Sequence, residues 1–155
     1  MGIEIERKFL VENDSWRAAV EVEERIMRGY LANNQNATVR VRIKGQRAFL
    51  TIKGMARGLC RAEFEYPIPV ADAEAMLRDL AAFPPLEKIR YQVRHDRDLW
   101  EVDVFAGENA GLVLAELELE RVDQAFALPD WVGNEVTQDP RYLNVNLARH
   151  PYRRW

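Results

Sequence analysis

Charged side chains spaced two residues apart recur along this 155-residue chain, and their types suggest chemistry on phosphate groups. Arginine binds phosphate oxygens with a planar fork, lysine adds a point charge, and carboxylates hold hard cations such as Mg²⁺ and Mn²⁺. The basic candidates are Lys8, Arg40, Arg42, Lys53, Lys88 and Arg90. The acidic candidates are Glu4, Glu6, Glu63, Glu65, Glu101, Asp103, Glu116 and Glu118. Gathered around one cavity, these two sets would bind a linear polyphosphate together with a divalent metal.

The spacing of two predicts that β-strands carry these side chains. Polar and apolar residues alternate over 3–11, 38–43, 49–54, 61–68, 87–94, 99–105 and 114–120. Such alternation is the strongest strand signal in a single sequence, and Gly- and Asn-rich turns separate the segments. The sequence therefore predicts one antiparallel β-rich domain over residues 1–155.

Helices are expected to be few and peripheral, which places the chain in the α+β class. Asp72 is a candidate cap for a helix over 73–83, which Pro84 and Pro85 would end. Further short helices are expected at 15–20, 123–128 and 140–147. The basic segment 140–155 would act either as a lid over one end of the sheet or as a plain packed helix.

The charged faces of the strands allow two interpretations. In an ordinary half-solvated sheet, apolar faces pack on a core and charged faces meet water. Here nearly every strand carries charges, arginine and glutamate dominate the polar positions, and the sign of the charge changes from strand to strand. These features favour a closed barrel with a wet, charged lumen and outward apolar faces. Buried ions cost several kcal/mol each, so water, counter-charges, metal and ligand must satisfy them.

The first and last predicted strands are the natural place for metal. Adjacent strands lie about 4.8 Å apart and side chains at i and i+2 about 6.7 Å apart. If the barrel closes between these strands, two metals roughly 3.5–4 Å apart could share Glu4, Glu6, Glu116 and Glu118. One metal would polarise the phosphates and the other would activate a water, while basic residues stabilise the leaving group.

The ordered set of motifs resembles the CYTH superfamily, also called triphosphate tunnel metalloenzymes. Glu4-Ile5-Glu6-Arg7-Lys8 is like its amino-terminal E-x-E-x-K signature, which alone is a weak signal. The later pairs follow the family order: Arg40/Arg42, Thr51/Lys53, Glu63/Glu65, Lys88/Arg90, Glu101/Asp103 and Glu116/Glu118. The resemblance covers essentially the whole chain, and it implies an eight-stranded antiparallel tunnel that binds triphosphate and a divalent metal.

The resemblance also implies roles for residues. Asp103 joins the four glutamates as a metal ligand, and Glu63, Glu65 and Glu101 become supporting tunnel carboxylates. Some relatives pair a tyrosine with the first-strand lysine, which makes Lys8, Tyr30 and Glu6 the catalytic candidates here. The alternative for Tyr30 is an ordinary packed aromatic near a turn.

Several functions fit this resemblance. Short stand-alone members are most similar to enzymes that hydrolyse inorganic tripolyphosphate to pyrophosphate and phosphate. The alternative is a class IV-type adenylate cyclase, or a phosphohydrolase of thiamine triphosphate or nucleoside triphosphates. Either would need a ring pocket, to which Tyr30, Trp100 or Trp131 could contribute. A non-catalytic polyphosphate-binding module would not need both acidic pairs, and a structural β-domain would need neither pair.

Composition limits the partners. The formal charge of −3 gives no electrostatic basis for binding nucleic acid. Cys60 is the only cysteine, so no intrachain disulfide is possible, and no Cys/His cluster suggests zinc. No apolar run is long enough to span a bilayer or serve as a signal peptide, so a cytoplasmic protein is expected. Whether it is a monomer or a homodimer stays open.

Overall fold

Nine strands form the frame of the computed structural model, which describes residues 2–155. The strands are β1 (Gly2–Val11), β2 (Val20–Asn33), β3 (Ala37–Lys44), β4 (Arg47–Gly54), β5 (Cys60–Ile68), β6 (Leu86–His95), β7 (Asp98–Phe105), β8 (Val113–Glu118) and β9 (Val132–Glu135). The α-helices are α1 (Val70–Asp79) and α2 (Asn144–Arg149), and the 3₁₀ helices are η1 (Ser15–Ala19), η2 (Gly107–Asn109), η3 (Pro140–Tyr142) and η4 (Tyr152–Arg154).

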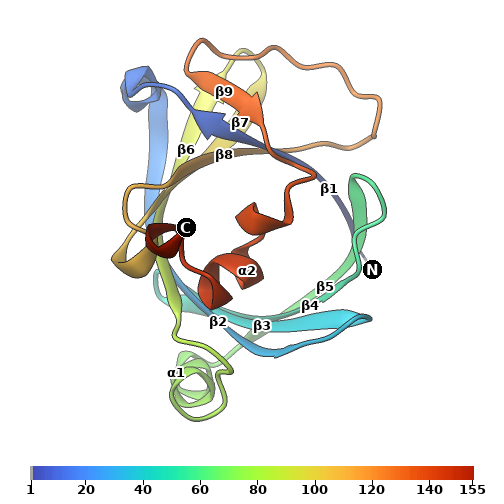
Figure 1. Cartoon of the computed structure of the whole chain (residues 1–155), viewed down its shortest axis with the longest axis vertical. Helices are drawn as coiled ribbons and strands as arrows, with labels where there is room; N and C mark the ends of the chain where they lie inside the picture. The colour runs from blue at the N-terminus through green and yellow to red at the C-terminus, as the bar shows by residue number, and fades with distance from the viewer. Residues whose placement is uncertain (1) are drawn as a thin grey trace.

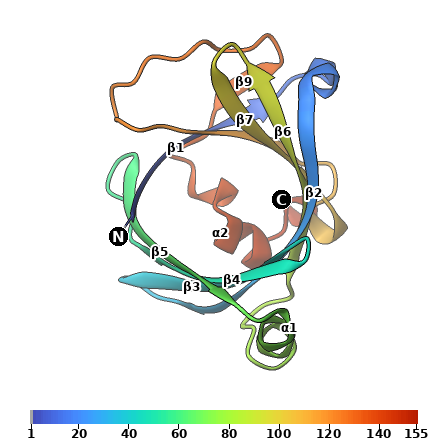
Figure 2. The same cartoon turned by 180° about the vertical axis from the view of Figure 1, so that it is seen from behind.

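Eight of the strands close into a barrel, as Figures 1 and 2 show from opposite sides. The order is β5-β4-β3-β2-β6-β7-β8-β1, and β1 closes the ring by pairing with β5. β1 does this with its first half, Gly2 to Ile5, while its second half pairs with β8. Every pairing is antiparallel, and β9 adds to β1 outside the ring. The predicted eight-stranded antiparallel barrel is therefore confirmed.

The apolar faces of the strands point outwards over most of the barrel. Phe9, Trp100 and Trp131 form one outer cluster, to which η1 adds Trp16 and the loop before β9 adds Phe126. The rings of Phe9, Trp100, Trp131 and Phe126 pack edge to face or tilted at centroid distances of 5.6–6.3 Å, a favourable geometry. They seal one side of the barrel wall from water.

Helix α1 covers a second outer cluster over β2, β3 and β4. Leu77 of α1 packs so close to β2 that a Cβ on Gly29 would collide with it. Arg7, the one charged residue on the outer face of β1, donates to Glu135 of β9 at 2.9 Å and lies over the ring of Phe126. Arg7 is therefore paired on the outer face of the barrel and does not enter the lumen.

One end of the lumen is apolar and is filled by the carboxy-terminal segment. Leu114 and Phe105 lie opposite the inward residues Asp103 and Lys88, so they also face the lumen. They pack with Tyr142 of η3 and other members of a third cluster, namely Leu86, Leu112 and Leu147. Both views place α2 within the ring of strands. The rule of charges inside and apolar residues outside therefore fails at this end.

Several element boundaries differ from the sequence prediction. The 14-residue strand β2 was missed, because Glu23, Glu24 and Arg25 break its alternation, although it pairs with β3 along one edge and β6 along the other. Strand pairing of this kind overrides local preference. The segment 123–128, predicted as helical, is irregular.

The predicted helix ends were also wrong. Helix α1 begins three residues before the expected start, with Pro69 at its N-cap, and it ends at Asp79. Asp72 therefore lies in the first turn, where its charge suits the helix dipole, instead of capping the helix. The expected helix over 140–147 is split into η3 and α2. No helix within residues 2–155 is long and apolar enough to cross a membrane.

Candidate active site: a charged tunnel

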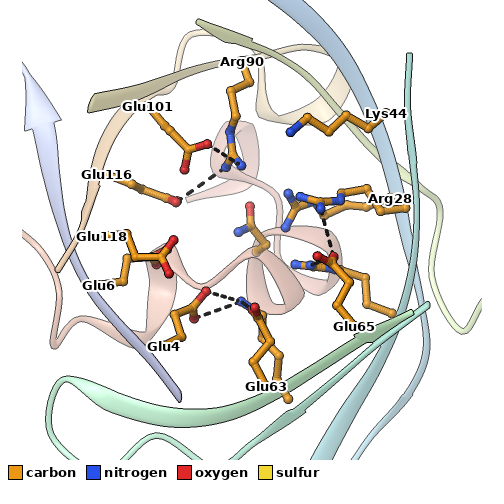
Figure 3. A pocket seen from close by; sticks show the side chains of 14 residues that line it. Glu4, Glu6, Arg28, Lys44, Glu63, Glu65, Arg90, Glu101, Glu116 and Glu118 are labelled. Carbon is orange, nitrogen blue, oxygen red and sulfur yellow. Dashed lines mark hydrogen bonds and ion pairs between the residues drawn. The ribbon is translucent and has the colours of Figure 1, made fainter. Parts of the chain in front are cut away.

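The lumen holds a cavity of about 180 Å³ in which every lining residue is charged or polar. Its walls separate by sign, as Figure 3 shows. We call β4, β3, β2 and β6 the basic arc, and β7, β8, β1 and β5 the acidic arc. The basic arc contributes Arg28, Arg40, Arg42, Lys44, Lys53 and Arg90. The acidic arc contributes Glu4, Glu6, Glu63, Glu65, Glu101, Glu116 and Glu118, and Asn144 of α2 lies between.

Strand pairing brings the first and last predicted strands side by side. Glu6 lies opposite Glu118, and Lys8 lies opposite Glu116. Lys53 of β4 reaches past β5 and donates to both oxygens of Glu4 at 3.0 Å. The expected meeting of the two acidic pairs is thus realised where β1 lies beside β8.

Glu6 and Glu118 are crowded carboxylates. Burial, together with the negative charges of Glu116 and Glu4, raises the pKa of Glu6 from its ordinary 4.5 to about 8. Burial and the charges of Glu4, Glu63 and others also raise the pKa of Glu118. Neighbouring carboxylates suppress each other's ionisation unless a cation lies between them.

The carboxylate set fits a hard divalent metal. All the donors are oxygens, and their crowding is the kind that Mg²⁺ or Mn²⁺ relieves. Among the residues described, 2–155, no three Asp, Glu, His or Cys side chains already converge as a metal cage. A bound ion would therefore take some ligands from phosphate and water, as Mg²⁺ usually does.

Glu116 lies beside Glu6 in an opposite electrostatic environment. Burial disfavours its ionisation, but Lys8 and Arg90 outweigh burial and bring the pKa of Glu116 to about 2. The distances are 3.6 Å to the Lys8 Nζ and 3.5 Å to an Arg90 guanidinium nitrogen. Glu116 is therefore ionised at every ordinary pH, whereas Glu6 holds a proton near neutrality.

Asp103 lies in a buried ion-pair network deeper in the barrel. Its two oxygens accept from Lys88 at 2.5 Å and from Arg90 at 2.8 and 2.9 Å. Neither Asp103 nor Lys88 lines the tunnel cavity. The two side chains thus satisfy each other, and the metal role expected for Asp103 and the phosphate role expected for Lys88 stay predictions. Asp103, itself held by Lys88, orients Arg90, which lines the cavity and contacts Glu101 at 3.3 Å.

The opposite wall holds Arg40 and Arg42. Arg42 donates to Glu65 at 2.9 Å. Arg40 donates to the Thr51 hydroxyl at 3.3 Å, and that hydroxyl donates to Glu65 at 2.9 Å. The predicted supporting carboxylate Glu65 thus holds both arginines in place.

Tyr30 is buried on the inner side of β2 instead of near a turn. It shares a small cavity of about 40 Å³ with Lys8, Glu6 and Arg40. The Lys8 Nζ donates to the backbone carbonyl of Tyr142 at 2.9 Å, so η3 fixes the position of the amine. The structure thus brings the three candidate catalytic side chains together.

Three lining residues were missed: Arg28, Lys44 and Asn144. Arg28 belongs to the strand that was not recognised, so its register could not be assigned. Its place two residues before Tyr30 was the available signal. The expectation that Trp100 or Trp131 contributes to a ring-binding pocket is wrong. Both side chains are buried in the outer cluster and do not line the tunnel.

The fold and its lining define a class of protein, a closed antiparallel barrel whose lumen sets a basic wall against an acidic one. Residues 2–152 match the model of the CYTH domain. The chain belongs to the CYTH family.

Relatives with similar sequences cover almost the whole chain. An inorganic triphosphatase of Acetivibrio thermocellus is 44% identical over 153 residues, covering 99% of this chain and 97% of the relative. An inorganic triphosphatase of Nitrosomonas europaea is 41% identical over 151 residues, covering 94% and 96%. A crystal structure of an inorganic triphosphatase aligns with a TM-score of 0.68 at 37% identity, covering 96% of this chain and 95% of that one.

Proposed function

We propose that this protein hydrolyses inorganic tripolyphosphate to pyrophosphate and phosphate. The carrying observation is that every residue lining the tunnel cavity is charged or polar. A nucleobase or thiamine ring would need an apolar or aromatic wall, and the tryptophans considered for that purpose pack outside the barrel. The names of the two full-length relatives support the same substrate. A cytoplasmic setting remains a prediction, as does a monomeric or homodimeric state.

The acidic arc would hold Mg²⁺ or Mn²⁺ through Glu4, Glu6, Glu116 and Glu118. When bound, such an ion supplies Lewis-acid polarisation of phosphate oxygens and lowers the pKa of bound water. The side chains of the protein bind and orient the substrate from the opposite wall, where Arg40, Arg42, Lys53 and Arg90 face the cavity. Their fixed charges neutralise the negative charge that grows on the departing pyrophosphate.

A substrate panel tests this proposal. Turnover of tripolyphosphate, ATP and thiamine triphosphate is measured with Mg²⁺, with Mn²⁺ and with EDTA. We expect kcat/KM for tripolyphosphate to be at least about tenfold higher than for ATP or thiamine triphosphate, because no apolar or aromatic side chain lines the cavity to bind an organic group. EDTA should abolish turnover. A preference for ATP or thiamine triphosphate would favour an adenylate cyclase or an organic triphosphate phosphohydrolase instead.

Proton handling is assigned to Lys8 and Tyr30 under the same proposal. Positioned acid–base groups contribute typically about 10²–10⁴-fold in rate. We therefore expect Tyr30→Phe to lower kcat for tripolyphosphate by about 10²-fold, with KM little changed and an altered pH–rate profile. The matched control is Tyr66→Phe, which removes the same hydroxyl from an exposed tyrosine of β5. An unchanged kcat and pH profile in Tyr30→Phe would remove Tyr30 from the mechanism.

A further inference from the structure

The cations that line the tunnel cavity differ in whether a carboxylate already neutralises them. Ion pairs within 4.0 Å join Lys53 to Glu4 and Glu63, Arg40 and Arg42 to Glu65, Lys44 to Glu24, and Arg90 to Glu101, Asp103 and Glu116. Among the cations that line the cavity in the described part of the chain, Arg28 alone has no carboxylate within that distance. Its side chain makes no hydrogen bond within residues 2–155 either.

Arg28 is also buried. Only 2% of the residue is exposed, and its Nε has neither solvent nor a partner. Figure 3 shows the Arg28 side chain at the cavity, across from Glu116 and Glu118. An uncompensated buried charge costs several kcal/mol, so its place beside a cavity calls for an explanation, and a bound anion supplies one.

The neighbours of Arg28 make its environment more positive. It lies directly opposite Arg42 on β3. Burial and the charge of Arg28 lower the pKa of Arg40 to about 9, and the same two causes lower the pKa values of Arg42 and Lys88. The centre of the basic arc therefore places three arginines, Arg28, Arg40 and Arg42, against the single carboxylate of Glu65.

We propose that Arg28 is an additional phosphate-binding residue and that it supplies most of the affinity of the metal-free tunnel for a polyphosphate. The other lining cations must weaken an existing ion pair to engage an anion, whereas Arg28 loses none. Its planar fork suits two phosphate oxygens at once. This inference rests on the proposed function for the choice of tripolyphosphate as the probe.

The test compares Arg28→Gln and Arg28→Met with the unaltered protein and with Arg25→Gln. Arg25 belongs to the same strand but is exposed, so its variant has the same loss of charge away from the tunnel. Tripolyphosphate binding is measured by calorimetry in EDTA, and melting temperatures are measured without ligand. We expect both Arg28 variants to bind about 10–100-fold more weakly, as for loss of a hydrogen-bonded charge. Arg25→Gln should bind like the unaltered protein.

Melting separates a binding role from a structural one. Because Arg28 has no partner in the empty tunnel, both variants should melt at or above the temperature of the unaltered protein. A lower melting temperature or failure to fold in both variants would overturn the inference. So would wild-type affinity in the variants, or no metal-free binding by the unaltered protein. Arg28-dependent binding without metal-supported hydrolysis would instead refute only the proposed function.

Discussion

Glu6→Gln and Glu116→Gln are both expected to lower tripolyphosphate turnover by at least about 10²–10³-fold, the range seen when a group that stabilises transition-state charge is removed. Their effects on the stability of the metal-free protein should nevertheless have opposite signs. The two side chains lie on the neighbouring strands β1 and β8. Carboxylates surround Glu6, whereas Lys8 and Arg90 lie beside Glu116, so the two substitutions can be compared directly.

For Glu6 the folded pKa, about 8, is above the ordinary 4.5. Between these pH values the folded protein keeps a proton that the unfolded chain has lost, so the free energy of unfolding falls as pH rises from about 4.5 to about 8. Above that range the folded protein carries the full penalty of a crowded carboxylate. Glu6→Gln removes the penalty, and we expect it to raise the free energy of unfolding at pH 9 by on the order of a few kcal/mol.

For Glu116 the folded pKa of about 2 lies below the ordinary 4.5. Its contribution to stability is present above pH 4.5 and is lost as pH falls towards about 2. Glu116→Gln removes this contribution at neutral pH and leaves Lys8 and Arg90 with less counter-charge. We expect the free energy of unfolding at pH 7 to fall by about 2–3 kcal/mol.

Urea denaturation in EDTA at pH 5, 7 and 9, together with steady-state turnover in Mg²⁺ and Mn²⁺, measures both effects. Glu120→Gln serves as the control because Glu120 is exposed just beyond the end of β8. If Glu6→Gln destabilises the protein at pH 9, the crowding argument is wrong. If a well-folded Glu116→Gln variant keeps full turnover, Glu116 does not hold a metal.

The charged tunnel was largely predictable because inward and outward positions alternate strictly in most of its strands. β1, β3, β4, β5, β6, β7 and β8 were each found from that alternation. β2 was not, since Glu23 and Glu24 interrupt it, and Arg28 was missed together with its strand. The carboxy-terminal filling of one barrel end was not predictable either, because inward residues such as Leu114 look like any outward apolar residue of a strand.

Charge type alone also could not show which carboxylates are available to a metal. Asp103 and Glu6 both lie at alternating positions in acidic strands. Asp103 happens to face Arg90 across the β6–β7 pair, whereas Glu6 faces Glu118 across the β1–β8 pair. One becomes the centre of an ion-pair network and the other a crowded, protonated acid. Pairing partners and register, which a single sequence does not specify, decide between the two roles.

Asp103→Asn should cause the largest loss of stability of any single substitution in the lumen. Burial opposes ionisation of Asp103, but Arg90 and Lys88 together hold its pKa well below the ordinary 3.8. The stabilisation is therefore present above pH 3.8 and is lost as pH falls through the lower, folded value. Removing the charge leaves Lys88 without its carboxylate and Arg90 with only Glu101 and Glu116. Breaking such a buried pair typically costs about 3–5 kcal/mol. Urea denaturation at pH 7 measures the loss.

The control for this substitution is Asp98→Asn, at the start of the same strand, where the side chain forms no ion pair among the residues described. A double-mutant cycle sharpens the test. Lys88→Met removes one of the two cations that Asp103→Asn deprives of a counter-charge. Because the partners share one network, the double variant should be less destabilised than the sum of the single variants. Additive losses would mean that Asp103 and Lys88 contribute independently. The orientation of Arg90 would then need another cause.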